Sequence, residues 1–103
     1  MAYQSFFSFD SVIVIESLRK SEWPTGTDLF ETTIAPESLA QNIYPELYHV
    51  ASRRQMLGAL RNVATLASDG RAPIIHLEMH GNQQGLRLAT GETIDWDELA
   101  PVL

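Results

Sequence analysis

The stretch Pro73-Ile74-Ile75-His76-Leu77-Glu78-Met79-His80-Gly81 decides the fold that this chain is expected to adopt. Its run of apolar residues, opened by a proline and closed by a glycine, predicts a β-strand buried in a sheet. Alternate residues of a strand share a face, so the two histidines and the glutamate are expected on one side. The aliphatic residues Ile75, Leu77 and Met79 are then expected on the other side, with His80 at the carboxyl end.

A second strand and a helix are equally clear. Ser11–Ser17 contains four consecutive β-branched apolar residues, which is typical of a strand buried on both faces of a parallel sheet. Ser52-Arg53-Arg54-Gln55 has the form of a capping box, and apolar residues follow it at helical spacing as far as Gly70. This pattern predicts a helix of about 16 residues. Strand, helix and strand form a βαβ unit, which places the two strands parallel in one sheet.

The remaining segments are shorter and less certain in pattern. In Ala35–Val50, Pro36 can open a short helix that Pro45 would end. After Gly81 we expect a hairpin and the cap and first turn of a helix, at Leu86–Leu88 with Glu92–Ile94 and at Asp95–Glu98. Two parallel strands and a hairpin make a small sheet for a finished domain. We therefore expect residues 1–103 to form a single domain that is the N-terminal part of a larger one.

Composition restricts the classes of protein to which the chain can belong. Of its 103 residues, 45% are hydrophobic and 19% are charged, as in a globular protein. The net charge of −6 and the scattered basic residues disfavour nucleic acid and anionic membranes as partners. We find no apolar run of about 18 residues and no basic leader, and the chain has no cysteine for a disulfide or a thiolate metal site. A cytoplasmic protein is expected.

His80 is the candidate for chemistry. Active sites of parallel α/β sheets form outside the carboxyl ends of the strands, and Gly81 lets the chain turn there. An accessible imidazole can accept a proton and return it, which suits a general base. The alternative is a turn histidine that bonds its own loop. His76 is expected to be a buried ring held by a hydrogen bond, and Glu78, about 7 Å from His80 along the strand, is not expected to contact it directly.

Other kinds of site find less support. His76, Glu78 and His80 offer metal ligands on one strand face, but residues two apart converge poorly on a metal whose ligands lie at about 2 Å. No further ligand cluster completes such a site. The chain has no Gly-x-Ser-x-Gly elbow, and its glycines lack the lysine and helix start of a phosphate loop. No metal and no cofactor are expected, although an enzyme that uses zinc on the two histidines stays a third hypothesis.

Taken together, these segments resemble the N-terminal half of a CHAT-type, caspase-like cysteine peptidase from bacteria. In that family an apolar strand ends in His-Gly, and a hairpin of the form Gly-Leu-x-Leu-x-x-Gly follows. The likeness covers most of residues 10–103 and is most specific over Pro73–Leu99; its segments are Ser11–Ser17, Arg53–Ser68, Pro73–Gly81 and Gly85–Ile94. It implies an α/β fold with a partial caspase-like (Rossmann-like) parallel sheet, flanking helices and a β-hairpin.

The resemblance also implies an activity. His80 matches the catalytic histidine of the family, and Gly81 matches the glycine whose backbone N–H helps form the oxyanion site. His80 would draw the proton from a cysteine and later protonate the leaving amine of a protein or peptide substrate. The chain has no cysteine, and a base alone cleaves nothing. We therefore expect the cysteine beyond Leu103 or on a partner chain, no activity from this chain alone, and a role in bacterial defence or regulated proteolysis.

A non-catalytic interaction module is the alternative function. In that case the open edge of the sheet pairs with a partner or with another copy of the chain. His80 would then be a structural residue of a turn.

Overall fold

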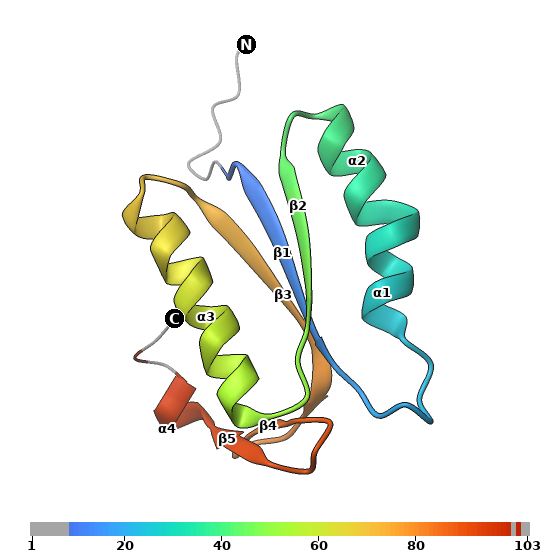
Figure 1. Cartoon of the computed structure of the whole chain (residues 1–103), viewed down its shortest axis with the longest axis vertical. Helices are drawn as coiled ribbons and strands as arrows, with labels where there is room; N and C mark the ends of the chain where they lie inside the picture. The colour runs from blue at the N-terminus through green and yellow to red at the C-terminus, as the bar shows by residue number, and fades with distance from the viewer. Residues whose placement is uncertain (1–8, 100, 102–103) are drawn as a thin grey trace.

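The computed structural model describes residues 9–99 and 101 and shows a five-stranded mixed sheet with helices on both faces (Figure 1). The strand order is β2-β1-β3-β4-β5. In chain order the elements are β1 (Ser11–Ser17), α1 (Thr25–Leu29), the π-helical η1 (Phe30–Ile34), α2 (Ala35–Ala40), β2 (Tyr44–His49), α3 (Arg53–Ser68), β3 (Pro73–Gly81), β4 (Gly85–Arg87), β5 (Thr93–Asp95) and α4 (Trp96–Leu99). The expected α/β fold is confirmed.

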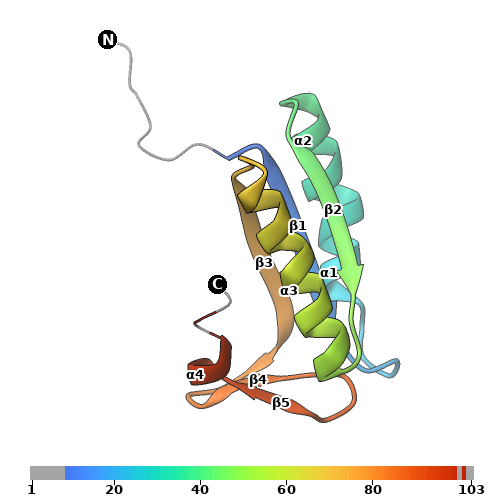
Figure 2. The same cartoon turned by 60° about the vertical axis from the view of Figure 1, so that its left-hand side comes forward.

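Strand β1 is the centre of the parallel part of the sheet. It pairs in parallel with β2 on one side and with β3 on the other, so that Ser11 lies opposite both Tyr44 and Pro73. Residues 13–17 of β1 are buried, as the run of β-branched residues predicts. The segment α1–α2 covers one face of the sheet and α3 covers the other (Figure 2).

Strand β2 is the element that the sequence pattern did not reveal. The expected short helix is present as α2 but ends at Ala40, and Pro45 lies inside the strand. Proline lacks the N–H that a central strand needs, yet β2 pairs only with β1 and lies at the edge of the sheet, where that N–H is not required. The sheet therefore contains three parallel strands, and α3 connects β2 to β3.

Helix α3 begins and ends where its sequence predicts. The Ser52 hydroxyl accepts a hydrogen bond from the Gln55 N–H at 3.2 Å, and the Gln55 side chain accepts one from the Ser52 N–H. The chain leaves the helix through Gly70, whose φ of 85° is readily adopted only by glycine. The helix spans 16 residues, as expected.

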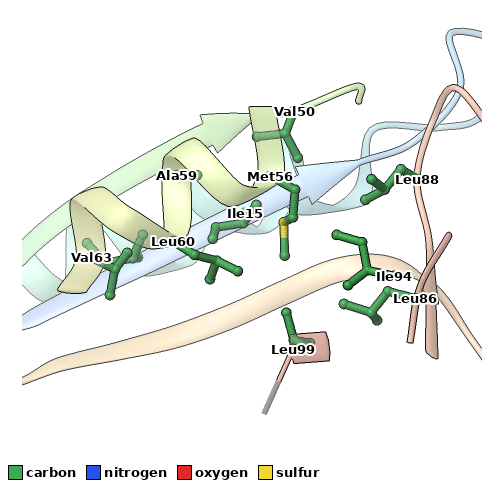
Figure 3. Close-up of a cluster of buried hydrophobic side chains, with 11 residues drawn as sticks. Ile15, Val50, Met56, Ala59, Leu60, Val63, Leu86, Leu88, Ile94 and Leu99 are labelled. Carbon is green, nitrogen blue, oxygen red and sulfur yellow. The ribbon is translucent and has the colours of Figure 1, made fainter. Parts of the chain in front are cut away.

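The apolar face of α3 forms the core with β1 and the β4–β5 hairpin. In Figure 3 side chains from these elements point toward one another. The buried residues of this core are Ile13, Ile15, Val50, Met56, Ala59, Leu60, Val63, Leu86, Leu88, Ile94 and Leu99. Because the hairpin supplies three of these side chains and α4 supplies Leu99, the C-terminal elements belong to the same folded unit as the parallel strands.

The expected hairpin is confirmed, and it lies at the carboxyl end of the parallel strands (Figure 1). Strand β4 is antiparallel to β3 and pairs only with the last two residues of β3, so that Arg87 lies opposite His80 and Leu86 opposite Gly81. The hairpin thereby covers the end of β3 and leaves the rest of that edge without a strand partner in the part of the chain that the structure describes.

We expect Gly85→Ala to destabilise the protein. A Cβ at Gly85 would lie 2.8 Å from the Asp95 Cα and even closer to the Ile94 carbonyl oxygen, and these backbone atoms cannot move without opening the hairpin. Gly58→Ala in α3 is the matched control, because a Cβ there meets nothing within 4 Å. It should stabilise by about 0.5–1 kcal/mol, since alanine is the better helix former. Urea denaturation checks both, and a Gly85→Ala variant as stable as the native chain would contradict the steric argument.

Candidate functional site

His80 lies at the carboxyl end of β3 with an exposed side chain. The expected alternation is confirmed in the strand register: Val14 and Glu16 of β1 lie beside His76 and Glu78, on the face opposite the core. The His80 side chain is 63% exposed, and its Nε2 atom lies 2.5 Å from the Glu22 Oε2 atom. Its partner Glu22 comes from the loop between β1 and α1, and no pattern in the sequence pairs this residue with His80.

The Glu22 carboxylate is held by its own loop. The Glu22 N–H donates to the Arg19 carbonyl oxygen at 2.9 Å, and the Arg19 N–H donates to the Glu22 Oε1 atom at 3.1 Å. The Oε1 atom thus bonds within the loop, and the Oε2 atom bonds His80. The hydrogen bond from His80 is the main cause that lowers the pKa of Glu22 below its ordinary value. Trp23, the next residue, is exposed.

His76 and Glu78 form a second imidazole–carboxylate pair on the same strand face. The His76 Nε2 and Glu78 Oε2 atoms are 2.9 Å apart, so the glutamate bonds His76 and not His80. The expectation that His76 is a buried ring is wrong, because 41% of its side chain is exposed. In Figure 1 α1–α2 lie toward the β2 side of the sheet, and on this face of β3 α1 approaches Glu78, where a Cβ on Gly26 would meet the Glu78 Cβ atom. Among the described residues no three His, Cys, Asp or Glu side chains are grouped to hold a metal ion.

The chain turns after Gly81 and not at it. Gly81 pairs with β4, its φ lies outside the left-handed region, and an added Cβ would make ordinary contacts at 3.5 Å. The turn is made by Asn82, whose Oδ1 atom accepts hydrogen bonds from the Gln84 N–H at 2.8 Å and the Gly85 N–H at 3.1 Å. The Trp96 indole N–H donates to the Asn82 carbonyl oxygen at 2.9 Å. The backbone beside His80 is therefore fixed from two directions.

Two hollows meet at His80. One has a volume of about 310 Å³ and is lined by Arg19, Glu22, His80 and Arg87; the other, of about 510 Å³, is lined by His80, Gly81, Arg87 and Asp95 among others. Within residues 9–99 and 101, neither arginine forms a salt bridge with a carboxylate. Two guanidinium groups without carboxylate partners beside a histidine can receive an anionic or strongly polar group of a bound molecule.

A buried carboxylate anchors the helical segment that follows this loop. Glu16, only 7% exposed, accepts hydrogen bonds from the Thr27 N–H at 2.8 Å and from the Thr27 hydroxyl at 3.0 Å. The His49 Nε2 atom lies 2.8 Å from the same hydroxyl. A Cβ on Gly26 would lie 2.8 Å from the Glu16 Oε2 atom and 2.9 Å from the Glu78 Cβ atom, so only glycine permits this close approach. The sequence analysis missed this cluster. The signal that could have revealed it is Glu16, a charged residue near the end of a buried strand.

Acid is expected to destabilise the protein through three carboxyl groups. The pKa values of Glu22, Asp10 and Glu98 are lowered mainly by hydrogen bonds from His80, from the Ala72 backbone and from Arg53, respectively. A carboxyl group with a lowered pKa binds fewer protons when folded. Its contribution is complete above the unfolded pKa of about 4 and is lost as the pH falls through the lowered value.

The urea midpoint should therefore fall as the pH is lowered through about 4. In Glu22→Gln the fall should be shallower, because one of the three titrating carboxyl groups is absent. A Glu22→Gln variant with the same pH dependence as the native chain would show that the contact with His80 does not perturb Glu22.

In the part of the chain that the structure describes, no helix is long and apolar enough to cross a bilayer. Comparisons of the chain with protein-family models, with curated proteins and with solved structures find no match.

Proposed function

We propose that the chain is the histidine-bearing segment of a caspase-like cysteine endopeptidase, and that His80 is the general base for a cysteine outside these 103 residues. The observation that carries the proposal is the His80–Glu22 pair at the carboxyl end of β3. A carboxylate that holds an exposed imidazole at the active-site edge of a parallel sheet is the arrangement that a general base requires. The resemblance of Pro73–Leu99 to CHAT-type peptidases is the reason for proposing a cysteine as the nucleophile.

The edge of β3 offers a place for the strand that would carry the cysteine. From Pro73 to Met79 this edge has no partner among the described residues, since β4 pairs only with His80 and Gly81. A parallel strand added here would end beside His80. It would also cover Ile75 and Leu77, which are only half-buried on the core side of the sheet. Under the proposal, a strand that carries the cysteine, from the same polypeptide or from a partner chain, would occupy this edge.

The proposed mechanism uses His80 twice. It accepts the proton of the cysteine thiol, and the thiolate attacks the carbonyl carbon of a peptide bond. The imidazolium then protonates the leaving amine, which leaves an acyl-enzyme, and the neutral ring next activates the water that hydrolyses it. The backbone N–H of Gly81 is the proposed donor to the oxyanion. The proposal places the enzyme in the cytoplasm, where a thiol stays reduced, with a role in bacterial defence or regulated proteolysis.

A second candidate function rests on the same strand edge. Ile74 is exposed next to the edge of β3 that has no strand partner among the described residues, and exposed edges of this kind bind extended segments of other proteins. In a non-catalytic interaction module the added strand would bring no nucleophile.

A cysteine-directed peptidyl electrophile distinguishes the two functions. We would treat source cells with a biotinylated acyloxymethyl ketone, isolate the polypeptide that contains these residues with its stable partners, and map the alkylated side chain. The endopeptidase proposal predicts one labelled cysteine, in the same polypeptide or in a bound partner. A complex that contains this chain and carries no labelled cysteine would contradict the proposal and favour the interaction module.

A further inference from the structure

We infer that Glu22 is the positioning residue of His80: its carboxylate holds the neutral imidazole with the proton on Nε2 and leaves Nδ1 as the atom that accepts the proton of the nucleophile. This inference rests on the proposed function and adds to it the orientation of the base. It concerns an interaction between residues that are far apart in the sequence and are brought together by the loop after β1.

The tautomer follows from the donors and acceptors in contact. The Glu22 Oε2 atom lies 2.5 Å from the His80 Nε2 atom, and an ionised carboxylate can only accept a hydrogen bond. When the ring is neutral, Nε2 must therefore carry the hydrogen. A neutral imidazole has only one N–H, so Nδ1 keeps a lone pair. Among residues 9–99 and 101 no hydrogen bond to Nδ1 of His80 is formed, and this nitrogen is available as the base.

The loop gives the carboxylate a fixed direction. Its Oε1 atom accepts from the Arg19 N–H, and the Glu22 N–H donates back to the Arg19 carbonyl oxygen. The side chain is half-buried, which limits competition from water, and its charge would stabilise the imidazolium that forms after proton transfer. His76 with Glu78 offers an internal comparison, because it is the same kind of pair on the same strand face but lies away from the carboxyl end.

The first arm of the test measures the tautomer in the isolated chain and needs no activity. Long-range ¹H–¹⁵N correlation spectra of histidine-labelled protein, at a pH at which the rings are neutral, report which nitrogen carries the proton. We expect His80 with a proton on Nε2 and a bare Nδ1. In Glu22→Ala its two nitrogen shifts should move toward each other, because the proton is no longer held on one atom, and the shifts of His76 should not change.

Two further variants complete this arm. Glu78→Ala should shift the His76 signals and leave His80 unchanged, which shows that each carboxylate acts on its own ring. Glu22→Gln should keep the proton of His80 on Nε2, because the amide oxygen can accept the same bond. A native His80 with its proton on Nδ1, or His80 signals that do not change in Glu22→Ala, would overturn the inference.

The second arm uses the intact enzyme. Glu22→Ala should lower kcat at least about tenfold with little change in KM, a smaller loss than the roughly 10⁴-fold caused by disturbing a fully buried orienting aspartate. Glu22→Gln should recover part of that loss, since it restores the tautomer but not the charge. Equal kcat values for Glu22→Ala and the native enzyme would overturn the positioning role. Failure to find any labelled cysteine would instead remove the proposed function, and the tautomer measurement would stand separately.

Discussion

His80→Ala is expected to lower the rate of peptide cleavage by the proposed endopeptidase about 10²–10⁴-fold. The imidazole is the group that would take the proton from the thiol and return it to the leaving amine, and no other histidine lies at the carboxyl end of β3 in the described part of the chain. Because the side chain is well exposed, its removal should leave the fold intact. The measurement is kcat/KM on a peptide substrate, with the circular dichroism spectrum as a check of folding.

His76→Ala is the matched control for this variant. His76 lies on the same face of β3, is also hydrogen-bonded to a carboxylate and is also partly exposed. Its replacement should leave the cleavage rate close to that of the native enzyme, because His76 lies four residues further from the end of the strand. Equal losses in the two variants would show that the loss reflects β3 as a whole and not the base.

Leu60→Ala is expected to lower the free energy of unfolding by about 2–5 kcal/mol. The Leu60 side chain is 2% exposed between α3 and the sheet, and its truncation leaves a cavity that the surrounding side chains cannot fill (Figure 3). A domain of this size has a total stability of roughly 5–15 kcal/mol, so the variant should lose a large share of it.

Leu39→Ala in α2 is the control for the core variant. Leu39 is also a helical leucine, but it is 66% exposed, so its removal should change stability by no more than about 0.5 kcal/mol. Urea denaturation measures both variants. Equal losses at the two positions would contradict the placement of the core between α3 and the sheet.

Most of the fold could be predicted because its signals are local. The β-branched run of β1, the capping box of α3 and the glycine-bearing hairpin each specify an element within a few residues. Strand β2 could not be predicted in this way. Its proline is unfavourable in a central strand, and only the position of β2 at the sheet edge, which is a property of the whole topology, makes that proline acceptable.

The site could be predicted only in part. The position of His80 follows from the strand that carries it, but its partner Glu22 lies 58 residues earlier in an irregular loop. No periodicity connects the two, since the contact depends on the parallel register of β1 and β3 and on the path of the loop. The prediction that His76 is buried was wrong for a similar reason. No local signal in the sequence shows where α1–α2 lie across the sheet.

The rate at which the proposed active-site cysteine is alkylated, measured against pH in the intact enzyme, tests the central claim most directly. If His80 takes the proton of the thiol, a reactive thiolate persists well below the ordinary cysteine pKa of about 8.5, and the profile of the native enzyme should have its midpoint there. In His80→Ala the midpoint should return toward about 8.5. Identical profiles for the native enzyme and His80→Ala would contradict the assignment of His80 as the base.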